Sequence, residues 1–478
     1  MNFTSFEFVA FFGLLLLARV WARRGAAELW LLLAASALFY LTWSVPCILL
    51  VGFTILMDYN VGRRLAATED PAARSRWLWL SVACNLGMLG FFKYTNFFLE
   101  NVQFLLGTVG VKAALPHLDI VLPPAISYFT FASLSYVVDV YYERGPACER
   151  LRDYGLFIMF FPKLLSGPIT RARDFLPQLV QRPPVTPEDV EIGLARFLVG
   201  AVKKLVIADQ VAGNVGLIFA APGRYDALTL AQGLCGFVTQ LYCDFSGYSD
   251  MAIGLARLLG FRLPENFQMP FSATDITDFW RRWHMSLSAW LRDYIFLPLE
   301  ILTRDNPNAT RRAALNILVT FVLCGLWHGA SWNFILWGAI MGTALAVHLT
   351  WRAWNPLRSW KGRTVLEFGW RQFSRVLTLG LVLLSFVFAR AATLADAGTF
   401  LKRLLTFRHD GTRLISPYIV PAVVVVVLAH FVLRRDGNWV AETVARPVWY
   451  RILAYSALLI ILTFLAATEG APFIYFKF

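Results

Sequence analysis

Long apolar runs separated by short polar connections make up most of this chain. The runs lie at about residues 6–22, 28–44, 46–58, 77–92, 120–140, 154–168, 193–220, 228–260, 313–351, 373–389, 415–433 and 450–468. A helix of about 20 apolar residues spans the hydrocarbon core of a bilayer, and several runs are long enough for two crossings. The pattern predicts an all-α polytopic membrane protein with roughly 11–13 transmembrane helices, together with interfacial helices.

Short groups of cations between the apolar runs predict the orientation in the membrane. They are Arg19, Arg23 and Arg24 after the first run, and Arg63, Arg64, Arg74 and Arg76 after the third. Cytoplasmic loops are enriched in Lys and Arg, so these loops are expected in the cytoplasm and the N-terminus outside. The cations between residues 402 and 413 depart from this alternation, which an interfacial amphipathic helix would explain.

The composition agrees with a membrane protein. Of the 478 residues, 58% are hydrophobic and 16% are charged, whereas soluble domains carry about 25% charged residues. The net charge of +13 is compatible with nucleic-acid binding, but the cations occur in short groups between apolar runs. No internal repeat and no soluble segment stands out, so residues 1–478 are expected to form a single membrane domain.

A polar stretch, Asp278–Tyr294, stands out in this apolar chain. If it is one helix, its apolar residues form a single seam, which consists of Trp280, Trp283, Leu287, Trp290 and Tyr294. The adjacent arc would carry Arg281, His284, Ser288 and Arg292. Asp275, with Ser272 or Thr274, is placed to cap the start. An interfacial helix with snorkelling arginines explains everything except His284, and a functional site is the alternative interpretation.

Residues 313–350 contain no Asp, Glu, Lys or Arg, and His328 lies near their middle. An ionisable residue at membrane depth is a functional-site candidate, and an imidazole suits acid–base catalysis. The stretch also fits two helices, with His328 at a turn near the headgroups and Gly329 at a helix end. Both interpretations stay open. The tryptophans that would wall a site are Trp327, Trp332 and Trp337.

Two further stretches place polar residues inside apolar runs. Asp244 and Asp250 either line a polar cavity or anchor helix ends through hydrogen bonds. The segment 160–171 contains Pro162, which breaks a helix beside Lys163. A broken helix at depth lines a cavity, although an ordinary helix end fits equally well.

The remaining patterns mainly exclude functions. The proline-containing connection 171–192 is predicted to be an extended loop. The chain has no P-loop, no Rossmann glycine motif and no G-x-S-x-G elbow. No carboxylate–histidine group has ligand spacing, so neither a metal nor a bound cofactor is expected.

Several blocks together resemble the bacterial membrane-bound O-acyltransferases, and most closely their alginate O-acetyltransferase branch. The two most specific are YCDFSGYSDMAIGLARLLGFRLPENFQMPFSATDITDFWRRWHMSLSAWLRDYIFLPL (242–299) and GLWHGASWNFILWGAIMG (325–342). Residues 122–142, 160–171 and the closing PFIYFKF fit the same branch, so the similarity covers most of the chain. Lys163 and Ser166 depart from it, because the branch often has an uncharged polar residue and an alanine there.

The resemblance implies a helical bundle around a central tunnel, in which a cytosolic acyl donor meets an acceptor hydroxyl. His328 matches the invariant histidine of the family, and His284 matches the histidine of its second signature block. These two residues are expected to be catalytic. The residues expected to line the tunnel or contact substrate are Trp327, Ser288, Arg281, Asp244, Trp332 and Asn333.

The expected function is transfer of an acetyl group from acetyl-CoA or a carrier-protein thioester to a cell-surface polysaccharide, or to a partner protein that passes it on. The expected location is the bacterial inner membrane, with no nucleic-acid partner. Transfer of D-alanine or of a fatty acyl group by an enzyme of the same superfamily is an alternative. A polysaccharide transporter or flippase is another, although such proteins often contain inverted repeats.

Overall fold

Apart from an isolated bridge between Tyr225 and Thr412, the regular structure of the described residues is helical. The computed structural model describes residues 1–22, 25–112, 114–182, 184–305, 308–354, 364–432, 439–467 and 470–474. Contacts divide the chain into unit 1, Met1–Leu194 with Met251–Pro264, and unit 2, Ala195–Asp250 with Glu265–Phe478. The single membrane domain stays a prediction.

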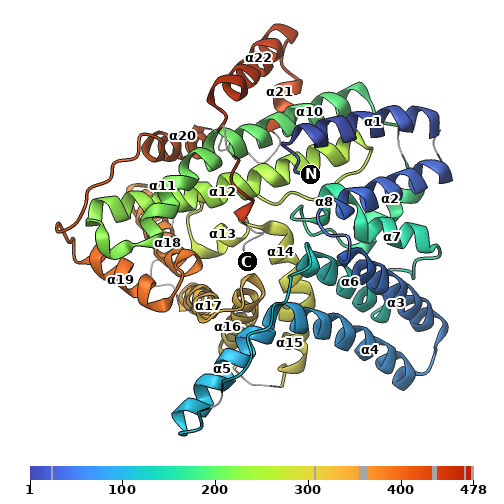
Figure 1. Ribbon diagram of the computed structural model, residues 1–478, viewed down its shortest axis with the longest axis horizontal. Coiled ribbons are helices and arrows are strands. Elements are labelled where there is room, and N and C mark those ends of the chain that lie inside the picture. The colour runs from blue at the N-terminus through green and yellow to red at the C-terminus, as the bar shows by residue number, and fades with distance from the viewer. Residues whose placement is uncertain are drawn as a thin grey trace. The chain divides into compact units, whose positions relative to one another are not determined.

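Unit 1 contains the first helices of the chain (Figure 1). They are α1 (Phe6–Ala22), α2 (Ala26–Leu41), α3 (Cys47–Ala67), α4 (Pro71–Leu89), the π-helical η1 (Gly90–Tyr94), α5 (Thr95–Thr108), α6 (Ile126–Tyr141), α7 (Leu151–Met159), α8 (Phe161–Leu164) and α9 (Ala172–Val180). Two longer helices have residues in both units, α10 (Pro187–Ala201) and α12 (Ala227–Leu258).

A buried carboxylate joins the packed helices α3, α4 and α6. Asp58 is fully buried and accepts hydrogen bonds from Ser81 Oγ at 2.6 Å and Asn85 Nδ2 at 2.8 Å. Ser133 Oγ on α6 donates to the same carboxylate. These three donors compensate for the loss of water around a charge that would otherwise be costly to bury.

The predicted helix break in residues 160–171 is confirmed, since α7 ends at Met159 and α8 begins at Phe161. Lys163 is buried, with its Nζ 4.1 Å from the centre of the Phe157 ring. The extended loop predicted for residues 171–192 is wrong, because α9 occupies its first half. The apolar residues Ala172, Phe175 and Leu179 are spaced for one helix face, and burial of that face outweighs the internal proline.

Unit 2 contains the remaining helices. They are the π-helical η2 (Val202–Ala208), α11 (Asp209–Ala220), the 3₁₀ turns η3 (Pro222–Arg224) and η4 (Pro270–Ser272), α13 (Ile276–Trp280), α14 (Met285–Leu291), the π-helical η5 (Arg292–Phe296), α15 (Leu297–Leu302), α16 (Ala309–His328), α17 (Trp332–Trp354), α18 (Thr364–Arg390), α19 (Leu394–Leu405), α20 (Ile419–Val432), α21 (Trp439–Val444) and α22 (Val448–Leu465).

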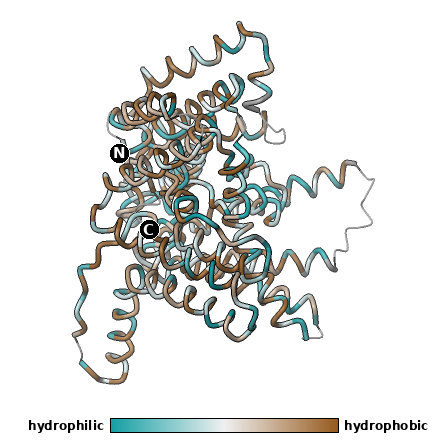
Figure 2. Tube along the Cα trace, turned by 90° about the vertical axis from the view of Figure 1, so that its right-hand side faces the viewer, coloured by the Kyte–Doolittle hydropathy of each residue, from teal (hydrophilic) through white to brown (hydrophobic). Residues whose placement is uncertain are grey.

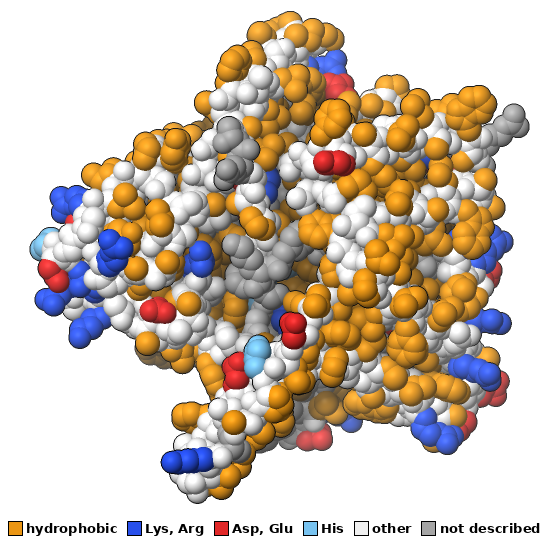
Figure 3. Space-filling view, viewed as in Figure 1, with side chains coloured by type: hydrophobic (Ala, Val, Ile, Leu, Met, Phe, Trp, Pro, Cys, Tyr) orange, Lys and Arg blue, Asp and Glu red, His pale blue; other side chains and the backbone are white. Residues whose placement is uncertain are grey.

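Within the described part, four helices are long and apolar enough to cross a membrane. They are Ala309–His328, Trp332–Arg352, Val365–Arg390 and Val448–Leu465, and shorter apolar helices occur at Ala26–Leu41 and Ile419–Val432. Long hydrophobic stretches follow the helices in Figure 2, and hydrophobic side chains cover much of the face in Figure 3. The all-α, multi-pass membrane class is confirmed. The number of crossings and the central tunnel stay predictions.

Three sequence features fall outside the described residues. These are Arg23 and Arg24 of the first cationic group, and residues 475–478 of the closing block.

Candidate active site

Asp278–Tyr294 is not the single helix that its periodicity predicts. Helix α13 ends at Trp280, and α14 begins at Met285. His284, immediately before α14, has a left-handed backbone with φ of 45°. Such a residue cannot continue a right-handed helix, and it costs roughly 1–2 kcal/mol for a side chain other than glycine. The predicted cap is confirmed, because the Asp275 carboxylate accepts a hydrogen bond from Asp278 N at 2.8 Å.

The left-handed turn separates the residues that a continuous helix would place on one arc. His284 is fully buried, whereas Arg281 and Arg292 are exposed. The structure therefore does not bring Arg281 to the imidazole. Ser288 follows one turn after His284, and its buried Oγ has no hydrogen-bond partner among the described residues. Four apolar residues of the predicted seam are buried, namely Trp280, Trp283, Leu287 and Trp290.

Asn266, in the connection after α12, holds the ring of His284. Its Oδ1 accepts from His284 Nδ1 at 3.0 Å and from Ser286 Oγ at 2.9 Å. Its Nδ2 donates to Ser249 Oγ at 3.0 Å. The backbone N–H of Ser286 points to the same Oδ1 at 3.4 Å, which sets the amide orientation. His284 therefore carries its proton on Nδ1, and Nε2 presents a lone pair.

His328 is the last residue of α16, and Gly329 follows as the helix cap. The two-helix interpretation of residues 313–350 is therefore the one that the structure supports, although His328 is buried. The helices α16 and α17 approach closely at two glycines. A Cβ added to Gly338 would collide with the backbone oxygen of Phe321. Gly325 lies directly opposite Gly338, and a Cβ added to either glycine would crowd the backbone of the other. Small residues allow this backbone contact, which fixes His328 one turn after Gly325.

The two histidines come together inside unit 2. The centres of the His284 and His328 rings are 6.4 Å apart. Trp327 and Trp337 flank His328, with ring centres at 4.8 Å and 5.2 Å. His328 borders a cavity of about 20 Å³, enough for about one water-sized group. Other residues around it are Phe237, Leu241, Trp283, Phe334, Phe386 and Ala389.

Comparison with known proteins identifies the family of the chain that carries this histidine pair. The family model for membrane-bound O-acyltransferases matches residues 150–379. A probable alginate O-acetylase AlgI of Pseudomonas aeruginosa is 38% identical over 87% of this chain and 78% of its own length. A protein of the same description from Pseudomonas putida is 34% identical over 94% of both chains. This chain belongs to the membrane-bound O-acyltransferase family.

A peptidoglycan O-acetyltransferase of Helicobacter pylori is also similar, at 32% identity over 79% of this chain and 73% of its own length. The protein is thus an O-acyltransferase and a multi-pass membrane protein, as the sequence blocks predict.

Not every predicted site residue of this acyltransferase lies at the histidine pair. Trp332 is 55% exposed. Asn333 is buried and donates to Ala391 O at 2.8 Å. Asp244 pairs with Lys204 at 2.8 Å and accepts from the backbone N of Ile474 at 2.7 Å. The contacts of Asp244 and Asn333 fit anchoring of neighbouring segments.

Sequence reasoning missed two residues that touch His284. The Oδ1 of Asn266 accepts a hydrogen bond from His284 Nδ1. The ring of Phe245 lies edge-on to the imidazole, with the two ring centres 4.6 Å apart. Phe245 directly follows Asp244, so its place in a polar block was a usable signal. Asn266 gave no signal, because its partners Ser249 and Ser286 are distant in sequence.

Burial lowers the pKa of His284 well below its usual value, and the nearby His328 lowers that pKa further. The imidazole of His284 is therefore neutral at pH 7. Among the described residues, no group of three or more His, Cys, Asp and Glu side chains could hold a metal ion. The absence of a cofactor stays a prediction.

Proposed function

We propose that this acyltransferase moves an acetyl group from a cytosolic thioester to a hydroxyl of a cell-surface polysaccharide, directly or through a partner protein. The proposed location is the bacterial inner membrane, and the proposed donor is acetyl-CoA or a carrier-protein thioester. The observation that carries the proposal is the pair of buried histidines, whose ring centres are 6.4 Å apart and of which His328 borders a small cavity. The names of two similar bacterial proteins, a probable alginate O-acetylase and a peptidoglycan O-acetyltransferase, support the acetyl group and the glycan acceptor.

In this mechanism His328 is the general base. Its imidazole takes the proton of the acceptor hydroxyl as the oxygen attacks the thioester carbonyl. The new C–O ester bond forms, the C–S bond breaks, and the thiolate leaves and receives the proton. Positioned acid–base catalysis of this kind contributes roughly 10²–10⁴-fold.

His284 has a different role, which its hydrogen bond to Asn266 supports. Because Nδ1 donates to Asn266 Oδ1, the lone pair on Nε2 can accept a hydrogen bond. A neutral ring in this tautomer can orient an acceptor hydroxyl, whereas it has no second proton with which to polarise a carbonyl. His284 is therefore proposed to position the acceptor. Trp327 is proposed to flank the acceptor. Ser288, one turn after His284, is proposed as the third polar side chain of the site, beside the two histidines.

The test is a bacterial strain that lacks this protein and is complemented with variants. Mass spectrometry of its surface glycans should show loss of ester-linked acetyl, restored by the wild type and not by His328→Ala. A matched control is His348→Ala, since His348 lies in the same charge-free run but faces Asp275 at 3.4 Å. His348→Ala should restore acetylation.

Other outcomes separate the alternatives. Loss of D-alanyl or fatty-acyl esters in place of acetyl would support the related transferases. Loss of the surface glycan itself would support a transporter. Full acetylation by His328→Ala would refute the proposed base.

A further inference from the structure

Unit 1 contains a cavity of about 920 Å³ with walls from its own helices. The start of α2, the end of α6 with the following loop, and the helices α7 and α9 surround it. Its volume is within the range of about 300–1,000 Å³ that is usual for small-molecule sites. Part of the lining is apolar, through Leu29, Val140, Leu176 and Leu179.

Cations predominate among the charged groups of this cavity. Three carboxylates line it, Asp139, Glu149 and Asp153. Five arginines face them, which are Arg144, Arg150, Arg152, Arg173 and Arg182. Arg144 and Arg150 are exposed, and neither pairs with a carboxylate in the part of the chain that the structure describes. The cavity therefore keeps positive charge that its own carboxylates do not neutralise.

Three helix N-termini add to this positive charge. α2 begins at Ala26, α7 at Leu151 and α9 at Ala172, and residues at or next to each start line the cavity. No side chain caps any of the three starts. The first N–H groups of a helix and its macrodipole stabilise an anion, so three converging starts reinforce the arginines.

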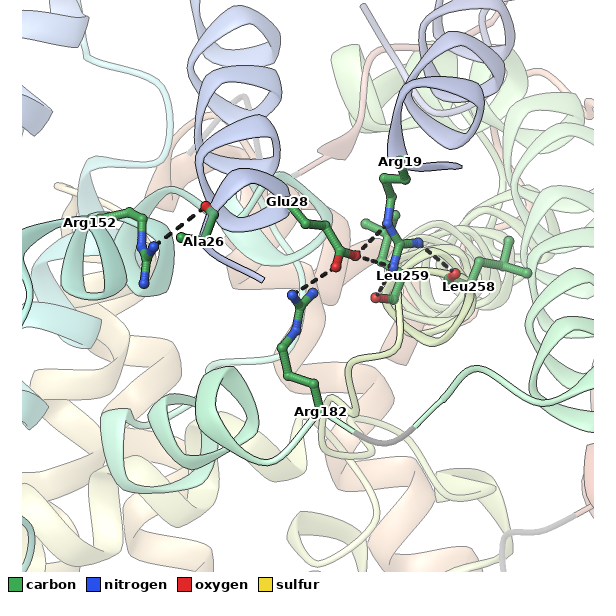
Figure 4. Close-up of polar contacts among 7 residues, drawn as sticks. All are labelled: Arg19, Ala26, Glu28, Arg152, Arg182, Leu258 and Leu259. Atoms are coloured by element: carbon green, nitrogen blue, oxygen red, sulfur yellow. Dashed lines mark hydrogen bonds and ion pairs between the residues drawn. The ribbon is translucent and has the colours of Figure 1, made fainter. Parts of the chain in front are cut away.

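Ion pairs fix the walls in place (Figure 4). Glu28 on α2 accepts from Arg19 Nε at 2.8 Å and from Arg182 at 2.9 Å. Arg19 also donates to two carbonyl oxygens at the end of α12, at 3.2 Å and 3.0 Å. Arg152 donates to Ala26 O at 3.5 Å. A cavity held in this way loses little conformational freedom when a ligand binds.

The orientation predicted from the loop charges would put this cavity on the cytosolic side. Arg74, in the cationic group after the third apolar run, donates to Tyr141 O at 2.7 Å, at the end of α6. Arg19, in the first cationic group, is hydrogen-bonded to Glu28 of α2, whose start also lines the cavity. Both groups belong to loops that the charge distribution assigns to the cytoplasm.

We infer that the unit 1 cavity binds a phosphate ester from the cytosol, namely the phosphate-bearing end of a coenzyme A thioester. The identification with the acyl donor rests on the proposed function. Arginines bind phosphate oxygens in pairs of parallel hydrogen bonds, and the apolar lining suits the slender pantetheine arm. The phosphate of an anionic phospholipid headgroup has the same chemistry, and the experiment distinguishes the two sources.

The experiment measures binding of free coenzyme A to the full chain in phosphatidylcholine nanodiscs by isothermal titration calorimetry. Free coenzyme A has no acetyl group, so turnover does not interfere. The variant Arg144→Gln/Arg150→Gln should bind about tenfold or more weakly, because charged hydrogen bonds to phosphate are lost. Arg144→Lys/Arg150→Lys keeps the charge and should bind more tightly than the glutamine pair. Arg76→Gln, at an exposed arginine of α4 outside the cavity, should bind as the wild type does.

A parallel arm uses native mass spectrometry of the same proteins with phosphatidylglycerol. Retention of this lipid by the wild type and its loss from the glutamine pair, without coenzyme A binding, would support the phosphate site and assign it to a headgroup. Equal binding of both ligands by the wild type and the glutamine pair would overturn the inference. That result would leave the proposed function untouched, because glycan acetylation and its loss in His328→Ala are measured independently.

Discussion

Replacing Asn266 with alanine should reduce catalysis by misplacing His284. The amide of Asn266 is buried, accepts from His284 Nδ1 at 3.0 Å and from Ser286 Oγ at 2.9 Å, and donates to Ser249 Oγ at 3.0 Å. Alanine leaves two buried donors without this acceptor. Each buried unsatisfied donor costs about 1–3 kcal/mol, so the free energy of unfolding should fall by about 2–6 kcal/mol.

The catalytic loss follows from the tautomer of His284. Without Asn266 Oδ1, the proton is no longer held on Nδ1, and the ring must be reoriented before Nε2 can accept from a substrate. If reorientation forfeits one buried hydrogen bond of about 1–3 kcal/mol, kcat should fall about 5- to 150-fold. KM should change less, because the substrate contacts of other side chains remain.

The assay is acetyl transfer by the purified protein in detergent, at a temperature well below the unfolding midpoint of each variant. Asn316→Ala is the matched control. Asn316 is also a buried amide in unit 2, but it donates to Glu300 and Thr303. Its replacement should lower stability and keep kcat. Wild-type kcat in Asn266→Ala, or an equal loss of kcat in both variants, would refute the orienting role of Asn266.

Three further predictions follow from the same structure. Gly338→Val should destabilise the contact of α16 with α17 by about 1–3 kcal/mol and lower activity. Gly380 has open space around it, so Gly380→Ala should change neither stability nor activity. Equal melting temperatures of the two variants would contradict the close packing at Gly338. Burial keeps the pKa of His284 below its unfolded value of about 6.5, so the folded state binds fewer protons. Stability should therefore fall below about pH 6.5, by up to about 1.4 kcal/mol per pH unit. His284→Gln should reduce this slope in thermal unfolding, and an unchanged slope would argue against the burial effect. Asp244→Ala removes the acceptor of the Ile474 amide, so that amide should exchange its hydrogen faster, as measured by hydrogen exchange with mass spectrometry. Unchanged protection of the amide would count against Asp244 as an anchor of this segment.

Much of the fold follows from patterns that the sequence makes visible. The charge-free run 313–350 predicts apolar helices, and Gly329 marks the end of the first at His328. Asp275 is recognisable as a cap because an acidic residue before a helix accepts its first N–H groups. These signals are local, and each involves residues within one or two helical turns.

The errors arise where long-range contacts outweigh local periodicity. Residues 278–294 have helical spacing, yet His284 adopts a left-handed backbone. Hydrogen bonds to Asn266 stabilise this turn, and no periodicity reports on a residue 18 positions away. Residues 172–180 were predicted to be a loop because of their polarity and proline, but burial of Phe175 and Leu179 makes them helical.

The sequence by itself determined the class of molecule and the family. Apolar runs of this length belong in a bilayer, where each backbone group must be bonded internally, and helices satisfy that condition. The two histidine blocks indicated His284 and His328 as the candidate catalytic residues. Only the tertiary structure decided that His284 and His328 lie 6.4 Å apart, that Arg281 lies elsewhere, and that Asn266 fixes the tautomer of His284. The physical reason is that hydrogen bonds and close packing between distant segments depend on where the chain folds back, which a one-dimensional pattern does not record.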